Sequence, residues 1–156
     1  MTTATKPLVL RAETAAELMS VDPISIQADA FVAEAVVLLT ERGFSAAPVI
    51  DEAGRPVGVV SRTDLLVHDR EEGAPTACSA HEQESLGTGF QVKRIDSTRV
   101  ADVMTPVVFC VAPDDSAEHV IAQMLSLNVH RLFVVDSDGV LVGVISGQDV
   151  LRFIRS

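Results

Sequence analysis

Two short stretches of the sequence combine the end of a strand with residues that suit a phosphate and a sugar. Residues 58–64 read Gly-Val-Val-Ser-Arg-Thr-Asp, and residues 143–149 read Gly-Val-Ile-Ser-Gly-Gln-Asp. In each, glycine permits close approach of another group, β-branched residues continue the strand, and serine stands where a helix would begin. A helix start offers unpaired N–H groups to a phosphate, and a nearby carboxylate can accept hydrogen bonds from ribose hydroxyls. The two stretches therefore predict a nucleotide cradle that occurs twice.

The same pattern also has a purely structural interpretation. Ser-x-x-Asp at a helix start is close to a capping box, in which the two side chains satisfy the helix's own donors. For either copy alone, capping is the favoured interpretation. The choice between cradle and cap depends on the rest of the repeat.

The composition is that of an acidic protein with an aliphatic core. Of the 156 residues, 47% are hydrophobic, with only six Phe and no Trp or Tyr. This length suffices for one compact domain or two small fused ones. The net charge of −10 argues against binding to a nucleic-acid polymer or to an anionic membrane surface. Cys78 and Cys110 make no disulfide framework, and neither a signal peptide nor a membrane span is visible, so we expect a soluble cytoplasmic protein.

The hydrophobic pattern predicts a unit of structure that occurs twice. In its first copy we expect a short helix over 14–19, a strand over 23–26 and a helix from the cap Asp29 to Gly43. Strands over 46–50 and 56–60 then form a hairpin, and a helix covers 63–68. The second copy repeats these features 85 residues later, with Asp114 as the cap, and no gap is needed between Met19 and Leu66. Chance similarity does not hold a register that long, so we interpret the chain as a duplication.

The duplication divides the chain into four parts. We expect a tail over 1–13, repeat 1 over 14–68, an exposed connector over 69–99 with a strand near 89–95, and repeat 2 over 100–156. Each repeat would have a three-stranded sheet with helices on one side and an open face to bury. Packing the two open faces together about a pseudo-twofold axis would create two equivalent clefts, each lined by both halves.

The order and spacing of these motifs resemble the CBS (cystathionine-β-synthase-type) domain. In the second copy the similarity covers 104–151, through Met-Thr-Pro, Pro-Asp-Asp-Ser, His-Arg-Leu-Phe-Val-Val-Asp and Gly-Val-Ile-Ser-x-x-Asp-Val-Leu, and in the first copy it covers 19–66. The resemblance implies an α/β (α+β) fold of two β-α-β-β-α CBS repeats, packed face to face with pseudo-twofold symmetry as a Bateman module. It also implies a regulatory role, an adenosyl ligand (AMP, ADP, ATP or S-adenosylmethionine), no required cofactor, and a disc-like homodimer.

The resemblance further implies which residues bind the ligand. Asp64 and Asp149 would hold the ribose hydroxyls, with Ser61, Thr63 and Ser146 beside the phosphate or ribose. The remaining positions would face the cleft or lie near the adenine: Phe44, Ser45, Ala46, His130, Arg131, Ile24 and Phe109. A His-Arg pair contacts phosphate in AMP-binding relatives, and only the second copy has one. We therefore expect the two clefts to be unequal.

Other chemistry has a weaker basis in the sequence. His130 and Arg131 could be ordinary polar surface residues. Cys78 and His81 supply only two ligands, too few for a zinc site. Cys110 is expected to be a small buried hydrophobe rather than a nucleophile, and no catalytic triad or carboxylate pair stands out. We therefore expect a sensor of an adenine nucleotide, not an enzyme. The alternative is an interaction module without a ligand, in which the Ser-x-x-Asp elements are only caps and the partner is another protein.

Overall fold

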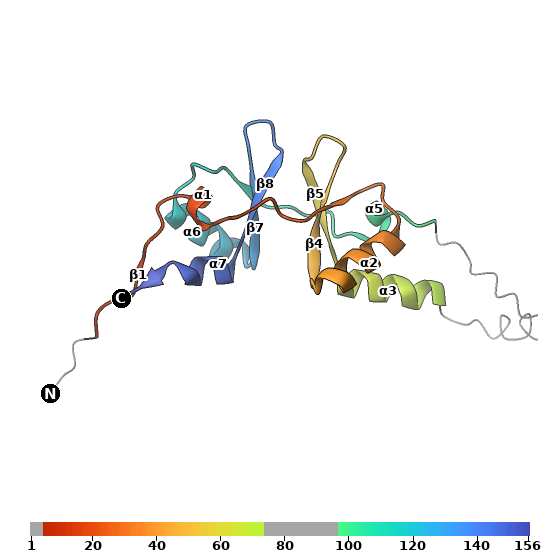
Figure 1. The fold of residues 1–156 in the computed structure, drawn as a ribbon, viewed down its shortest axis with the longest axis horizontal. Coiled ribbons are helices and arrows are strands. Elements are labelled where there is room, and N and C mark those ends of the chain that lie inside the picture. The colour runs from red at the N-terminus through yellow and green to blue at the C-terminus, as the bar shows by residue number, and fades with distance from the viewer. Residues whose placement is uncertain (1–4, 74–96) are drawn as a thin grey trace, which may run out of the picture.

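Two sheets stand side by side at the centre of the molecule, and the longer helices flank them (Figure 1). The computed structural model describes residues 5–73 and 97–156. In the first half, the strands are β3 (Ile26–Gln27), β4 (Ala46–Ile50) and β5 (Pro56–Ser61), with helices α2 (Val32–Arg42) and α3 (Arg62–Gly73). In the second half, they are β6 (Cys110–Val111), β7 (Arg131–Val135) and β8 (Leu141–Ser146), with α6 (Ala117–Leu127) and α7 (Gly147–Arg152). The predicted fold of two β-α-β-β-α repeats is confirmed.

The two central hairpins, β4–β5 and β7–β8, follow directly from the local sequence. In β4, Ala47 and Val49 alternate inward and are almost fully buried. At the turn, Asp51 Oδ1 accepts hydrogen bonds from the backbone N–H groups of Ala53 and Arg55, both at 2.9 Å. Gly54 follows with φ of 83°, a left-handed conformation that glycine adopts without strain. The same turn recurs 85 residues later, so each half carries the same hairpin.

The two halves exchange their short first helices. Helix α1 (Ala15–Leu18) buries Ala15 and Leu18 in the core of the second half, beside Val120 and Ile145. Helix α5 (Val100–Val103) in turn buries Val100 in the core of the first half. The chain therefore crosses the molecule twice, once after α1 and once after α5 (Figure 1).

The exchange also corrects the predicted strand count. The first sheet has the three expected strands, in the order β3-β4-β5, but the second has four, in the order β2-β8-β7-β6. The additional strand, β2 (Ser20–Val21), follows α1 and pairs antiparallel with β8, with Ser20 opposite Val144. At the equivalent place in the first half, only a single bridge forms, between Val59 and Thr105.

Several predicted boundaries were wrong. Helix α2 begins after Phe31 rather than at Asp29, and α6 is capped by Ser116, whose Oγ accepts from the His119 N–H at 3.1 Å, rather than by Asp114. Asp29 and Asp114 lie in turns that precede the helices. In the turn that contains Asp29, the Ala30 N–H donates a hydrogen bond to the Gln27 carbonyl. The first strand begins at residue 26 instead of 23, since Asp22 adopts a left-handed φ of 48° between β2 and β3.

The predicted connector is also shorter than 69–99. Helix α3 continues to Gly73, so residues 69–73 are helical. Arg99 is the N-cap of α5, lies opposite Phe31 in an isolated bridge, and stacks its guanidinium on the Phe31 ring at 4.0 Å. The strand predicted near 89–95 lies outside the described residues. Within the described ranges, no helix combines the length and the apolar character needed to cross a bilayer.

Glycines 58 and 143 allow the exchanged segments to approach the sheets. A Cβ built on Gly58 would lie 2.7 Å from the Thr105 carbonyl oxygen and 2.7 Å from Met104 Sδ, and one on Gly143 would lie 2.5 Å from Met19 Sδ. The close approach expected from the sequence at these glycines is confirmed.

Gly58→Ala is expected to lower the free energy of unfolding by about 1–3 kcal/mol, because the added methyl overlaps backbone as well as side chain. Urea denaturation measures the change. Gly147→Ala is the control, since a Cβ there meets nothing within 4 Å. A Gly58→Ala midpoint equal to that of the unsubstituted protein would show that the exchanged segment is not packed as described.

Candidate functional site

A cleft of about 680 Å³ lies between the two halves, and both contribute to its walls. The first half and the segments that cross between the halves supply Ser20, Pro23, Ile24, Gly43, Phe44, Ser45, Ala46, Ala47, Pro48, Val59, Thr105 and Val107. The second half supplies Phe109, Val129, Arg131, Phe133, Val144, Ser146, Gln148, Asp149 and Arg152. Such a volume is within the range of about 300–1,000 Å³ typical of small-molecule pockets.

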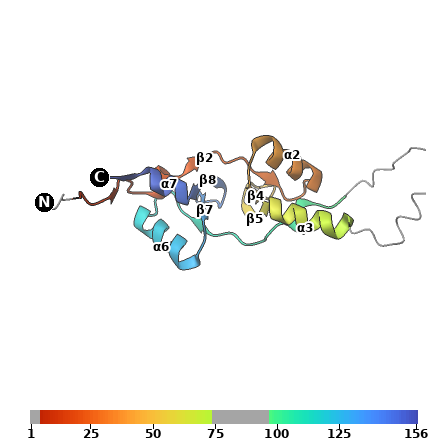
Figure 2. The same cartoon turned by 90° about the horizontal axis from the view of Figure 1, so that it is seen from below.

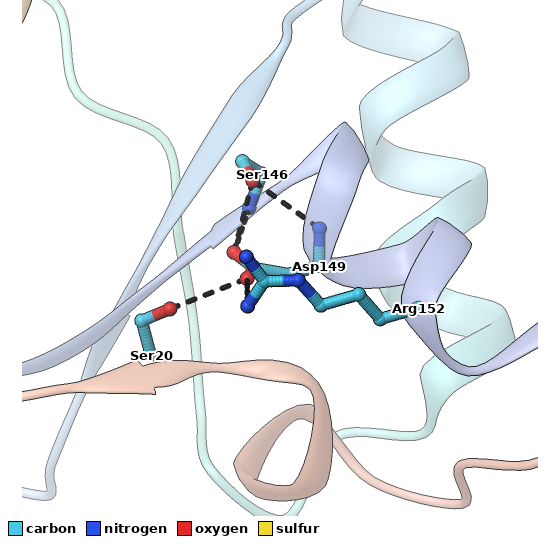
Figure 3. A network of polar contacts seen from close by, with 4 residues as sticks. All are labelled: Ser20, Ser146, Asp149 and Arg152. Atoms are coloured by element: carbon cyan, nitrogen blue, oxygen red, sulfur yellow. Dashed lines mark hydrogen bonds and ion pairs between the residues drawn. The ribbon is translucent and has the colours of Figure 1, made fainter.

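Asp149 is the buried charged side chain of the cleft. It is 7% exposed, and no other polar or charged residue is buried in the part of the chain that the structure describes. Its Oδ2 accepts hydrogen bonds from the Ser146 N–H at 2.8 Å and from Ser146 Oγ at 2.9 Å (Figure 3). Its Oδ1 accepts from Ser20 Oγ at 3.2 Å and lies 3.7 Å from Arg152 Nη1. The two short bonds to Oδ2 thus orient the carboxylate, while Oδ1, with its longer contacts, is the oxygen that could accept a hydrogen bond from a ligand.

The capping interpretation holds for both Ser-x-x-Asp motifs. Ser146 Oγ accepts from the Asp149 N–H at 3.3 Å, and Ser61 Oγ accepts from the Asp64 N–H at 3.2 Å. Asp64 Oδ2 in turn accepts from the Ser61 N–H and Oγ, both at 2.9 Å. The Gly147 N–H also donates a hydrogen bond, to the His130 carbonyl at 3.2 Å. Backbone N–H groups at these helix starts, which we had expected to bind a phosphate, are therefore already bonded within the protein. Positive charge at the cleft comes instead from arginine side chains.

Arg131 supplies one of these charges and connects the two halves. It begins β7, and its Nη2 donates to Ser45 Oγ of the first half at 3.3 Å. Both side chains are exposed, so this bond is available for exchange with a ligand. Arg152 supplies the other charge, because it lies one helical turn after Asp149 on the same side of α7.

The structure brings most, but not all, of the predicted site residues together. The cleft lining includes Ile24, Phe44, Ser45, Ala46, Phe109, Arg131, Ser146 and Asp149. It does not include Ser61, Thr63, Asp64 or His130. The Ser-x-x-Asp motif therefore has different surroundings in the two halves. The expectation of two unequal clefts stays a prediction.

Ser20 and Arg152, the two cleft residues that contact Asp149 Oδ1, were not predicted from the sequence, although signals for both were present. Ser20 comes directly after Met19, as Thr105 comes after Met104, so the duplication marks a hydroxyl at both positions. Arg152 stands three residues after Asp149, a spacing that places two side chains on one face of a helix.

Apolar side chains make up much of the cleft's remaining surface. Ile24 and Phe44 are each 37% exposed and Phe109 is 36% exposed, although all three are large hydrophobic residues. Large apolar surface that remains accessible inside a cleft is typical of a binding site for a flat ring. The site thus combines an apolar region, a fixed carboxylate and two guanidinium groups.

Cys110 is not part of the cleft lining. Cys110 in β6 is exposed, so the prediction that it is buried was wrong: it lies on the face of a short edge strand. Partial desolvation of its thiol raises its pKa, which favours the unreactive thiol over the thiolate. Cys78 and His81 lie outside the described residues. Among the residues that are described, no group of three His, Cys, Asp or Glu side chains could hold a metal ion.

Comparison of the sequence with protein families and with known proteins identifies CBS domains in both halves of the chain. The family model of the CBS domain matches residues 15–71 and again residues 100–156. The chloroplastic CBS domain-containing protein CBSX1 of Arabidopsis thaliana is 35% identical over 76% of this chain. The chain spans 53% of that protein's length. Because this relative is chloroplastic, the cytoplasmic location expected from the sequence remains a prediction.

Two solved structures resemble this chain along most of its length. The crystal structure of CBSX2 in complex with AMP has a TM-score of 0.65 and 30% identity, with 89% of this chain and 93% of the other covered. The cytosolic domain of the Mg²⁺ channel MgtE in complex with ATP has a TM-score of 0.65 and 28% identity, with 90% and 48% covered.

Proposed function

Because this chain belongs to the CBS domain family, we propose that it is a regulatory module that binds an adenine nucleotide in the cleft between its halves. The observation that carries the proposal is the Asp149 carboxylate, buried and oriented by Ser146, at the wall of a cleft that also has accessible apolar surface. The complexes of CBSX2 with AMP and of MgtE with ATP support the choice of ligand class.

Each part of the cleft suits one part of such a ligand. The adenine would lie against the exposed apolar side chains Ile24, Phe44 and Phe109. The ribose hydroxyls would donate to Asp149 Oδ1, displacing the 3.2 Å bond from Ser20. The phosphate would pair with the two guanidinium groups, Arg131 and Arg152. An uncharged nucleoside would leave these two cations without a new partner.

Regulation requires that the ligand bind one arrangement of the halves better than another. The geometry of the cleft supports such a preference, since its walls come from both halves and Arg131 bonds to Ser45 across it. A nucleotide that replaced this bond would change a contact between the halves. We propose that the resulting movement, rather than any catalysed reaction, is the signal.

Titration calorimetry with AMP, ADP, ATP and S-adenosylmethionine tests the proposal. At least one of these is expected to bind with a Kd below about 1 mM, equivalent to more than about 4 kcal/mol of binding free energy. Adenine without ribose is the control and should bind more weakly, because it cannot use Asp149. If none of the four binds at millimolar concentration, the sensing function is wrong and the module acts without a ligand.

Assembly as a homodimer is a further part of the proposal. Leu66 of α3 is 61% exposed, and its equivalent Leu151 of α7 is 65% exposed. A groove of about 710 Å³ lies between α2 and α3, lined largely by apolar residues such as Val36 and Leu65. Helices α3 and α7 lie along the same lower side of the molecule (Figure 1) and face the viewer when it is seen from below (Figure 2). A patch repeated by the pseudo-twofold axis suits a second copy of the same chain.

The double substitution Leu66→Glu and Leu151→Glu tests this assembly, because charges at the two exposed leucines would oppose burial of the patch. Sedimentation equilibrium is expected to show a dimer for the unsubstituted protein and a monomer for the double variant. A monomeric unsubstituted protein, or a variant that remains dimeric, would contradict this assignment of the interface.

A further inference from the structure

A smaller cavity of about 350 Å³ adjoins the cleft and is lined by three arginines, Arg11, Arg152 and Arg155. Ser20, Asp149 and Arg152 line this cavity and the cleft alike. The two cavities therefore meet at the carboxylate proposed to hold the ribose. A ligand whose sugar lies at Asp149 has access to both.

Pairing between the first and last strands brings two of these arginines together. Strands β1 (Val9–Leu10) and β9 (Ile154–Arg155) are antiparallel, with Val9 opposite Arg155 and Leu10 opposite Ile154. The pairing continues to Arg11, whose N–H donates to the Phe153 carbonyl at 2.8 Å. Leu10 and Phe153 pack on the core of the second half and hold the strand pair beside α7. Two guanidinium groups far apart in the sequence thus reach one cavity.

Charge is distributed unusually around this cavity. The chain has a net charge of −10, yet this small lining contains three of its 12 basic residues. Among the described residues, the side chains of Arg11 and Arg155 have no hydrogen-bond or ion-pair partner. The two acidic lining residues are already engaged: Glu17 accepts from the backbone N–H groups of Glu13 and Thr14, and Asp149 is bonded to Ser146 and Ser20.

The other half of the chain repeats only one of these three charges. The positions displaced by 85 residues from Arg11, Arg152 and Arg155 are Asp96, Val67 and Arg70. The arginine cavity is therefore a property of one side of this protein and not of the duplicated unit. Its chemistry suits a multiply charged anion, because guanidinium groups form paired, charge-assisted hydrogen bonds with phosphate oxygens.

We propose that this cavity binds the β- and γ-phosphates of a nucleoside triphosphate whose adenosine lies in the cleft. The inference rests on the proposed function and narrows it from adenine nucleotides in general to those with a polyphosphate tail. Arg152, shared by both cavities, contacts the α-phosphate, and Arg11 and Arg155 contact the phosphates beyond it. A monophosphate reaches Arg152 but leaves the other two arginines unpaired.

Calorimetry with AMP and ATP on matched double variants tests the inference. The unsubstituted protein is expected to bind ATP about tenfold or more tightly than AMP, as paired contacts to two further phosphates suggest. Arg11→Gln with Arg155→Gln should weaken ATP binding by about tenfold and leave AMP binding within about twofold. The control, Arg42→Gln with Arg55→Gln, removes the same charge at exposed positions that line neither cavity and should change neither affinity.

The outcomes separate this inference from the proposed function. If AMP binds but ATP binds no more tightly, or if both double variants weaken ATP equally, the arginine cavity is not a phosphate site while the nucleotide function stands. If no nucleotide binds, the proposed function is wrong. Titration with inorganic tripolyphosphate then tests whether the arginine cavity binds a polyphosphate anion by itself. Binding that disappears only in the Arg11 and Arg155 variant would support an anion site there; no binding would overturn it.

Discussion

Leu18→Ala is expected to lower the free energy of unfolding by about 2–5 kcal/mol, as truncation of a buried leucine does when the core cannot close the cavity. Leu18 is 1% exposed and packs in one cluster with Val111, Leu132 and Ile145. All three partners belong to the second half, although Leu18 belongs to the first repeat in the sequence. The Leu18→Ala substitution should therefore destabilise mainly the second half of the molecule, although Leu18 lies in the first repeat.

Chemical denaturation measures the overall change, and amide hydrogen exchange locates it. Protection of β7 and β8 is expected to fall more than protection of β4 and β5. Val21→Ala is the matched control, because Val21 follows in the same segment but is 66% exposed. If β4 and β5 lost protection first, α1 would pack in its own repeat and the exchange of helices would be refuted.

Asp149→Asn is expected to weaken nucleotide binding by about tenfold to a hundredfold, since hydrogen bonds to a charged group contribute about 1.5–3 kcal/mol. The substitution keeps the size of the side chain but removes the charge that makes the carboxylate a strong acceptor of ribose hydroxyls. It also weakens the capping box with Ser146, and loss of such a cap costs about 0.5–2 kcal/mol of stability. Calorimetry with the nucleotide that binds most tightly measures the affinity.

Asp64→Asn is the matched control for this prediction. It removes the same charge and weakens the same kind of capping box, with Ser61, at the equivalent helix start. Because Asp64 is not part of the cleft lining, nucleotide affinity should stay within about twofold of the unsubstituted protein. Equal losses in the two variants would mean that the effect comes from capping, or that both halves bind ligand.

The elements with strong local signals were predictable from the sequence. The hairpins could be predicted because Asp51 and Gly54 have turn-specific roles that recur in the second copy. The duplication followed from a register that holds without a gap. The exchange of α1 and α5 could not be predicted, because periodicity shows that Leu18 and Val100 are buried but does not show which core buries them.

The candidate site was predictable only in part, for a related reason. Asp64 and Asp149 have the same local motif, and both form the same cap. Their difference lies in what surrounds them: Ser20 reaches Asp149 through the exchanged strand β2, and Arg131 stands at the edge of the same cleft. The contact of Ser20 with Asp149 and the approach of Arg11 to Arg155 both depend on pairing between strands that are distant in the sequence. A local sequence pattern does not specify such pairing.

A crystal structure of this protein grown with ATP or AMP would show directly whether a nucleotide lies in the cleft. We expect one nucleotide per chain between the halves, with a ribose hydroxyl within hydrogen-bonding distance of Asp149 Oδ1 and the adenine against Ile24, Phe44 or Phe109. A nucleotide bound beside Asp64 instead, or a cleft that stays without ligand at saturating nucleotide, would contradict this expectation.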